Sequence, residues 1–408
     1  MLTMFQKVYA SRDAREQAGV FTSHLLLNIS FFLVMFIASK SLGAAEFASL
    51  SLANTWIMTL ATIFSFGMDQ TALKLSIERH SSSYIGINLI AKALFFVIAF
   101  GVFLVGTLLY GPSANLVIVA AAAGVALWSA TRVVEQYERH FTRLAWLNLS
   151  FAITRLVVGG LAIASQDWVL IVLALHVIAQ LPVHVTTLAT AVRELRSTIT
   201  LSSLRPMLTV SPLMFLSISL WGSLSLITQS VLHDRGDVLA TSAFGVALLF
   251  MSPVDLVIGT FRVYVLPQIL LRDMKEIDVF GLGAGSFNVI VLAFAAVFMT
   301  VTVPIAGLIH WIYGAQFPLA GWFFLIYFGG AVVTISVGLL NLRVQRENLL
   351  RLAVLVNLGR AGATALLMLL PTISPIGVVI WSTIVMIIGE IVLWAVINRV
   401  ERRQIRSA

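Results

Sequence analysis

Long, predominantly apolar runs recur along the whole chain, and short segments between them hold most of the charged residues. Twelve runs are long enough for an α-helix to cross the hydrocarbon core of a bilayer. They are continuously apolar and do not alternate as membrane β-strands do. The pattern predicts an all-α polytopic membrane protein with about twelve transmembrane helices, at roughly 20–38, 48–66, 86–109, 115–131, 145–164, 168–190, 208–231, 239–265, 281–303, 319–341, 350–370 and 375–397.

Lysine and arginine residues are distributed very unevenly between the two sides of this arrangement. Twenty-one of the 26 lie in the terminal segments and in alternate loops that share one side, whereas the other side holds only Lys40 and Arg235. Because loops rich in Lys and Arg stay in the cytoplasm, both termini are predicted to be cytoplasmic. The three remaining cations fall within the apolar runs and are Lys92, Arg155 and Arg360.

Composition excludes several classes of protein. Hydrophobic residues make up 59% of the chain and charged residues 11%, whereas a soluble domain carries about 25% charged residues. The chain has no cysteine, so disulfides and thiolate metal sites are absent. His176 and His184 share a helix face without an acid beside them, and no phosphate-binding loop of the Walker type is present. We therefore expect no cofactor, no metal and no nucleic-acid partner, and we assign the net charge of +8 to topology.

The two halves of the chain echo each other. Leu42 to Phe47 resembles Leu239 to Phe244, Tyr110-Gly111 resembles Tyr313-Gly314, and Arg143-Leu-Ala resembles Arg351-Leu-Ala. Six runs per half is an even number, so the two repeats share one orientation in the membrane. The expected organisation is a cytoplasmic leader, two six-helix lobes around a central cavity and a basic cytoplasmic tail, at residues 1–19, 20–200, 201–398 and 399–408.

Arg155 and Arg360 lie near the middle of the fifth and eleventh runs. A central Arg costs a membrane span about 2.5 to 3.5 kcal/mol, so such residues usually face a protein interior or a water-filled cavity. Guanidinium groups also grip phosphate through paired donors. The sequence therefore predicts an anionic substrate. Arg155 has no acid at its depth in the next run, whereas Arg360 lies at a depth similar to that of Glu390 and either pairs with it or contacts the substrate.

Other polar residues in or near the runs have weaker interpretations. Asp255 either neutralises a buried arginine or loads a coupling ion, and Arg262 either lines the cavity or caps the eighth helix. Asp69 is a further candidate for ion coupling or charge pairing, although it is interpreted, with Lys74, Glu78 and Arg79, as a solvated loop charge. Lys92 lies near a helix end, from which a lysine side chain can snorkel to the interface. Most tryptophans suit interfacial anchoring, but Trp56 and Trp221 are candidates for stacking on sugar rings.

Four short segments resemble a known family. SLGAAEFASLSLANTW and FSFGMDQTALKL are similar to the opening of Wzx-type oligosaccharide flippases, which belong to the multidrug/oligosaccharidyl-lipid/polysaccharide (MOP) exporter superfamily. IYGAQFPLAG and VLPQIL are similar to later segments of that family, whereas Ala48 stands where the family usually has Gly.

The resemblance implies a two-lobed, non-enzymatic bundle in the bacterial inner membrane. Its expected substrate is a polyprenyl-pyrophosphate-linked glycan for surface polysaccharide synthesis, and its expected partners are the bilayer and assembly proteins such as a polymerase or a chain-length regulator. Peptidoglycan-precursor flippases of the same superfamily usually have fourteen spans, which argues against that branch.

Two alternatives remain open at this point. A drug or cation antiporter of the same superfamily should line its cavity with acids, whereas this chain places arginines in its spans. A membrane-integral polymerase or acyltransferase has similar hydropathy. Polymerases typically carry a large outward loop, however, and the longest outward loop expected here has about ten residues.

Overall fold

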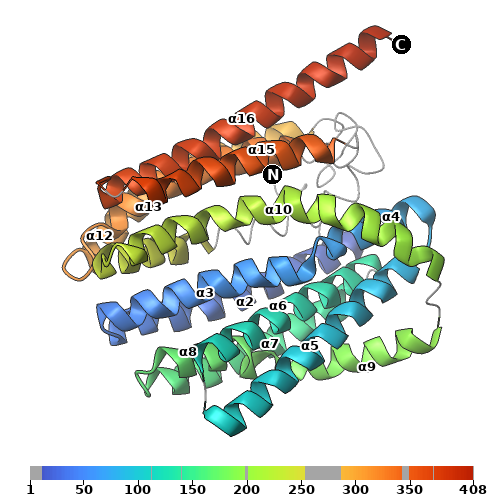
Figure 1. Ribbon diagram of the computed structural model, residues 1–408, viewed down its shortest axis with the longest axis horizontal. Helices are drawn as coiled ribbons and strands as arrows, with labels where there is room; N and C mark the ends of the chain where they lie inside the picture. Colours follow the sequence, from blue (N-terminus) through green and yellow to red (C-terminus); the bar gives the residue numbers. More distant parts are fainter. Residues whose placement is uncertain are drawn as a thin grey trace. The chain divides into compact units, whose positions relative to one another are not determined.

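The computed structural model is mainly helical in the residues that it describes, which are 12–111, 113–138, 140–197, 201–252, 286–341, 349–370 and 372–407. No strand occurs in these ranges, so the predicted all-α fold is confirmed (Figure 1). The α-helices are α2 (Arg12–Ser41), α3 (Ala44–Ser65), α4 (Met68–Arg79), α5 (Ser83–Tyr110), α6 (Ala114–Tyr137), α7 (Phe141–Ile163), α8 (Trp168–His176), α9 (Leu181–Ser197), α10 (Leu201–Asp234), α12 (Ser286–Tyr313), α13 (Ala320–Leu340), α15 (Leu350–Ala365) and α16 (Pro375–Ser407). Two short 3₁₀ helices are η1 (Ile178–Gln180) and η3 (Leu366–Leu369).

Ten of the described helical segments are long and apolar enough to cross a membrane. They coincide with ten of the twelve runs expected from the sequence. The seventh run coincides with α10, and the eighth begins in a shorter apolar helix, Val238–Ser252. Residues 253–285 lie outside the described part of the chain, so the remainder of the eighth run and the start of the ninth are not covered.

The chain forms two compact units, Met1–Phe215 and Leu216–Ala408. The boundary falls inside α10, which also contains Pro206 and Pro212. The expected lobes, 20–200 and 201–398, remain a prediction, as do the leader and the basic tail. Most of the leader lies outside the described residues, whereas the backbone of the tail continues α16 as a helix as far as Ser407.

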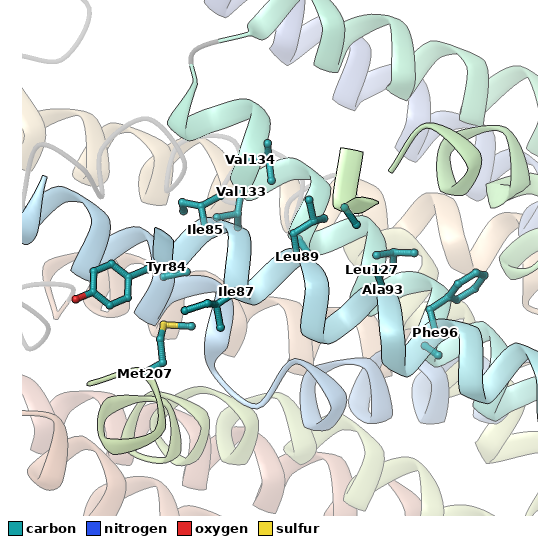
Figure 2. Packing of buried hydrophobic residues seen from close by; sticks show 14 of the residues in the cluster. Tyr84, Ile85, Ile87, Leu89, Ala93, Phe96, Leu127, Val133, Val134 and Met207 are labelled. Atoms are coloured by element: carbon teal, nitrogen blue, oxygen red, sulfur yellow. The ribbon is translucent and has the colours of Figure 1, made fainter. Parts of the chain in front are cut away.

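In the first unit α2 packs along α7, and α6 packs along both α3 and α5. The centre of α6 is a run of four alanines followed by Gly124, and these residues are buried. Small side chains allow helix backbones to approach closely in a membrane protein. Figure 2 shows the apolar cluster between α5 and α6, with Leu89, Phe96 and Leu127 among its members.

In the second unit α13 packs along both α12 and α16, and α15 packs along α16. Aromatic rings fill part of its interior, and Phe244 makes edge contacts with Phe323 and Tyr327. The short connection between α12 and α13 buries Tyr313 against Phe317. This is the IYGAQFP segment, whose aromatic residues therefore serve packing.

Two spans of the first unit are interrupted. Phe66 and Gly67 have left-handed backbone conformations with φ of 45° and 66°, and they separate α3 from α4. The sixth span is continuous in hydropathy but divides into α8, η1 and α9. Pro182 follows this second break, where it opens α9 without an N–H of its own. Each interruption brings polar residues into the interior of the unit.

Candidate functional site

Arg155 of α7 is buried, with 7% of its surface exposed, and it contacts no acid among the described residues. Its Nη1 donates to the backbone oxygen of Leu27 on α2 over 3.2 Å. Its guanidinium carbon lies 4.1 Å from the centre of the Phe151 ring and 5.4 Å from that of Phe31. These cation–π contacts hold the group in place, but its Nε has no hydrogen-bond partner.

Arg360 of α15 has its own counter-ion. Its Nη1 lies 3.0 Å from Oε1 of Glu390 on α16 and 2.8 Å from Oδ1 of Asn357, one turn away on the same helix face. Asn341 donates to the second carboxylate oxygen of Glu390. The geometry therefore matches the charge-pairing alternative for Arg360, although its Nε and Nη2 are buried without partners.

Glycine makes this ion pair possible. A Cβ added at Gly389, the residue before Glu390, would overlap the side chain of Arg360. The arginine therefore lies directly over the backbone of α16. At Gly338 of α13, by contrast, an added Cβ would stand 3.8 Å from the Glu390 carboxylate, which is an ordinary van der Waals contact.

Asp69 and Lys92 form a second buried pair, which corrects two expectations. Lys92 does not snorkel: it is 2% exposed, and its Nζ lies 2.6 Å from Oδ2 of Asp69. Asp69 is not a solvated loop charge, because Asn88 donates to its Oδ1 over 2.8 Å and Ser129 to its Oδ2 over 2.6 Å. The cluster joins α4, α5 and α6. Lys74, also interpreted as a loop charge, is buried as well.

The cluster also holds the first helix break together. Lys92 contacts Asp69 after the break and Ser65 before it, the latter over 3.0 Å. On another side the backbone of Gly67 approaches α10 so closely that a Cβ would overlap the backbone at Ser211 and Phe215. Glycine is therefore required at position 67 both for its positive φ and for this contact.

Arg132 is a further candidate, and it is one of the 21 cations that the charge distribution assigns to the cytoplasmic side. It lies on α6, three residues after Ser129, and so faces the same cluster. It is within electrostatic range of Asp69, Lys92 and His24. Its Nε is buried without a hydrogen-bond partner. No local signal in the sequence shows this, because only the structure extends α6 to Tyr137 rather than ending the helix near residue 131.

At the C-terminal end of α6, acidic side chains have basic partners. Arg143 of α7 lies 3.4 Å from the buried carboxylate of Glu135 and donates to Thr190 of α9 over 3.2 Å. His140 lies 3.0 Å from Glu138. These contacts tie the α6–α7 turn to α9, and they leave the deeper cations of the unit without further acid.

The remaining candidates are not brought into these clusters. Asp255 and Arg262 lie outside the described residues, as does the side chain of Trp221. Trp56 of α3 is 41% exposed, and its stacking on sugar stays a prediction. Within the described ranges no three His, Asp or Glu residues gather closely enough to hold a metal ion.

Positive charge exceeds negative charge around the buried polar residues of the first unit. Among the described residues of the first unit, Lys92 and Arg132 lie near one carboxylate, that of Asp69, and Arg155 contacts none, whereas the buried carboxylate of Glu135 faces Arg143. Lys92 contacts the carboxylate of Asp69 directly. A buried charge without a counter-ion is costly, so an anion that reached Arg155 would be strongly stabilised.

Comparison with known proteins yields a family match and several structures of the same fold. The profile of a family described as "Polysaccharide biosynthesis protein" matches residues 16–235, which is more than half of the chain. No curated protein matches the sequence. A multidrug resistance MATE transporter of the MOP superfamily in an outward-facing conformation is 13% identical, with a TM-score of 0.62 over 96% of each chain.

Two further structures show the same similarity. An inward-facing MATE transporter of the MOP superfamily is 15% identical, with a TM-score of 0.57 over 95% of this chain and 96% of that one. A MOP superfamily transporter from Pyrococcus furiosus is 14% identical, with a TM-score of 0.59 over 93% of this chain and 94% of that one. At these identities the similarity concerns the fold.

Proposed function

Because the chain belongs to the polysaccharide biosynthesis protein family and has the fold of MOP-superfamily transporters, we propose that it is a flippase for a lipid-linked oligosaccharide. The substrate is a polyprenyl-pyrophosphate-linked repeat unit of a surface polysaccharide. The protein acts in the bacterial inner membrane, and the polymerase and the chain-length regulator that use the flipped repeat unit are its functional partners.

The observation that carries this proposal is the environment of Arg155. The guanidinium is buried, is fixed by Phe151 and by the Leu27 carbonyl, and meets no carboxylate among the described residues. A pyrophosphate must leave water in order to cross the membrane, and charge-assisted hydrogen bonds to arginine offset that desolvation. Arg132 is a second cation of the same unit with an unpaired donor, and it adds to the preference for an anion.

The paired charges support the same conclusion by elimination. Arg360 is engaged with Glu390, and Lys92 with Asp69. Both pairs link neighbouring helices, which is the usual arrangement of intramembrane charges that serve structure. The excess positive charge among the described residues is thus concentrated in the first unit, where a cationic drug would be repelled.

The direct test uses purified protein in liposomes that contain a polyprenyl-pyrophosphate-linked oligosaccharide extracted from cells lacking the protein. A membrane-impermeant glycosidase added outside reports how much glycan is exposed. We expect complete digestion with the protein and about half without it, because a symmetric bilayer exposes only one leaflet. Equal digestion in both samples, together with transport of a cationic dye, would instead establish the drug-antiporter alternative.

A further inference from the structure

The guanidinium of Arg155 is enclosed by groups that hold it in place but do not neutralise it. The rings of Phe151 on α7 and Phe31 on α2 lie 4.1 Å and 5.4 Å from its central carbon, and the backbone oxygen of Leu27 accepts from Nη1. No carboxylate in the described ranges acts on it electrostatically. In this part of the chain, one carbonyl dipole and two aromatic faces are all that offsets a buried positive charge.

The same guanidinium has more donors than acceptors around it. Arginine carries more N–H groups than any other side chain, and among the described residues Arg155 makes a single hydrogen bond, from Nη1 to Leu27. Its Nε is buried without a partner. A buried donor without an acceptor costs free energy in addition to the cost of the uncompensated charge. A ligand that is negatively charged and accepts hydrogen bonds would lower both costs.

The nearest polar side chains supply dipoles and no counter-charge. His176 of α8 lies against the same Phe31 ring and is within electrostatic range of Arg155. It is 3% exposed, and its Nε2 bonds to the amide oxygen of Asn54 on α3 over 3.0 Å. Neither an amide nor a neutral imidazole carries a negative charge. The missing counter-ion must therefore come from outside the described residues.

The packing around Arg155 limits how large such a counter-ion can be in this conformation. Only 7% of the residue is exposed. Gly159, one turn further along α7, lies so close to α2 and α8 that an added Cβ would stand 2.9 Å from Val34 and 3.2 Å from Leu175. A glycan would have to open this packing, whereas a monatomic anion is little larger than a water molecule.

We propose that Arg155 binds a small monovalent inorganic anion, such as chloride, while no lipid-linked glycan is bound. The anion is the counter-ion that the described residues do not provide. This inference goes beyond the proposed function, and anion binding itself does not depend on it. Only the consequence for transport rests on it: the small anion must leave Arg155 before a phosphate of the substrate can take its place.

The first experiment uses chloride as the probe and needs no glycan. Chloride that exchanges between water and a protein site broadens the ³⁵Cl NMR line, and gluconate keeps the ionic strength constant. Arg155→Gln removes the charge and should lose most of the broadening that the wild-type protein causes. Arg193→Ala, which removes an exposed cation from α9, is the matched control and should retain it. Equal broadening by the wild type and Arg155→Gln would overturn the proposal.

The melting temperature gives an independent measurement of the same site. A ligand that binds only the folded protein stabilises it in proportion to the logarithm of the ligand concentration. Replacing gluconate by chloride should therefore raise the wild-type melting temperature by about 2 °C for each tenfold increase above the dissociation constant. Arg155→Gln should melt at the same temperature in both salts. Arg155→Lys, which keeps the charge with fewer donors, should respond only at higher chloride. A wild-type protein that melts equally in both salts contradicts the proposal.

Competition tests whether the anion occupies the position of the substrate phosphate. Inorganic pyrophosphate should remove the ³⁵Cl broadening of the wild-type protein by displacing chloride. In the flipping assay, chloride in place of gluconate should raise the concentration of lipid-linked glycan needed for half the maximal rate and leave the maximal rate unchanged. Broadening that persists at saturating pyrophosphate would show that the chloride lies elsewhere than at the phosphate contact.

The anion site and the proposed function fail in different ways. If chloride binds at Arg155 but the wild-type protein moves no lipid-linked glycan in either salt, the proposed function is wrong and the anion site stands. If the glycan moves and no chloride binds, the anion site is wrong and the flippase function stands.

Discussion

Buried cations in this protein differ in whether they carry a counter-ion. Arg360 and Lys92 each contact a carboxylate from a neighbouring helix, at 3.0 Å and 2.6 Å. Arg155 has aromatic rings and one carbonyl in place of an acid. A group whose charge is already compensated gains little from an anionic substrate, whereas an uncompensated group gains much. The two classes should therefore respond differently to mutation.

Arg155→Ala should abolish surface-polysaccharide production in a complementation assay while leaving the amount of protein in the membrane normal. Arg155→Lys should retain part of it, because lysine keeps the charge but loses the forked geometry of guanidinium. Arg193→Ala, which removes an exposed cation from α9, is the matched control and should complement fully. Full complementation by Arg155→Ala would mean that this residue does not hold the substrate.

Glu390→Gln and Arg360→Gln should each destabilise the protein by about 3–5 kcal/mol, because either change leaves a buried charge unpaired. The measurements are the amount of folded protein and its melting temperature in detergent. The double variant Arg360→Glu with Glu390→Arg should recover part of the loss. The structural interpretation fails if Arg360→Gln is stable but inactive while Glu390→Gln is active.

Gly389→Ala tests the ion pair between Arg360 and Glu390 by adding a methyl group to the helix backbone beneath it. Replacing glycine by alanine inside a helix normally stabilises it by about 0.5–1 kcal/mol. Here the added methyl group would overlap the Arg360 side chain, so the melting temperature should fall instead. Gly362→Ala on α15 is the control, since nothing lies within 4 Å of its Cβ position and the melting temperature should hold or rise.

At the scale of helices, the break between α3 and α4 depends on a single glycine. Gly67→Ala places a side chain at φ 66° and against the backbone of α10, so it should lower the yield of folded protein substantially. Gly101→Ala on α5, where nothing lies within 4 Å, should have no such effect. The comparison is made by size-exclusion chromatography in detergent. Equal yields for the two variants would show that the close contact with α10 is not needed for folding.

The helices themselves could be predicted from hydropathy, because burial in lipid demands long apolar segments. Their interruptions could not, since hydropathy carries no information on the backbone conformation of Phe66 or on where α8 ends. The pair of Arg360 and Glu390 was accessible because both residues could be placed at similar depths on antiparallel neighbours. The same reasoning applied to Asp69 and Lys92, which lie about equally far from Ser81, would have found that pair too.

The position of Arg132 in the interior of the first unit could not be predicted from the sequence. A cation near the end of an apolar run satisfies the charge rule for cytoplasmic loops, and nothing local distinguishes it from a solvated residue. Its buried Nε and its position near Asp69 follow from the packing of α6 in the middle of the unit, which is a property of tertiary structure.

For the whole molecule, orientation in the membrane is a prediction from charge placement. The chain contains no cysteine, so a single introduced cysteine would be the only thiol in the protein. Ser113→Cys and Gln316→Cys should react with a membrane-impermeant maleimide added to intact spheroplasts. Ser81→Cys should react only after the membrane is opened. The reverse pattern would invert the topology and with it the direction of transport.

Arg235 lies between α10 and the following helix, on the side expected to face outward, where few cations occur. It donates over 2.7 Å to the carbonyl of Ile373 and over 2.8 Å to those of Leu367 and Leu370. The predicted outward placement of Arg235 runs against the bias that retains positive charges inside. All three acceptors are synthesised long after the arginine has left the ribosome. The contacts that hold Arg235 can therefore form only after η3 and the turn before α16 have been synthesised.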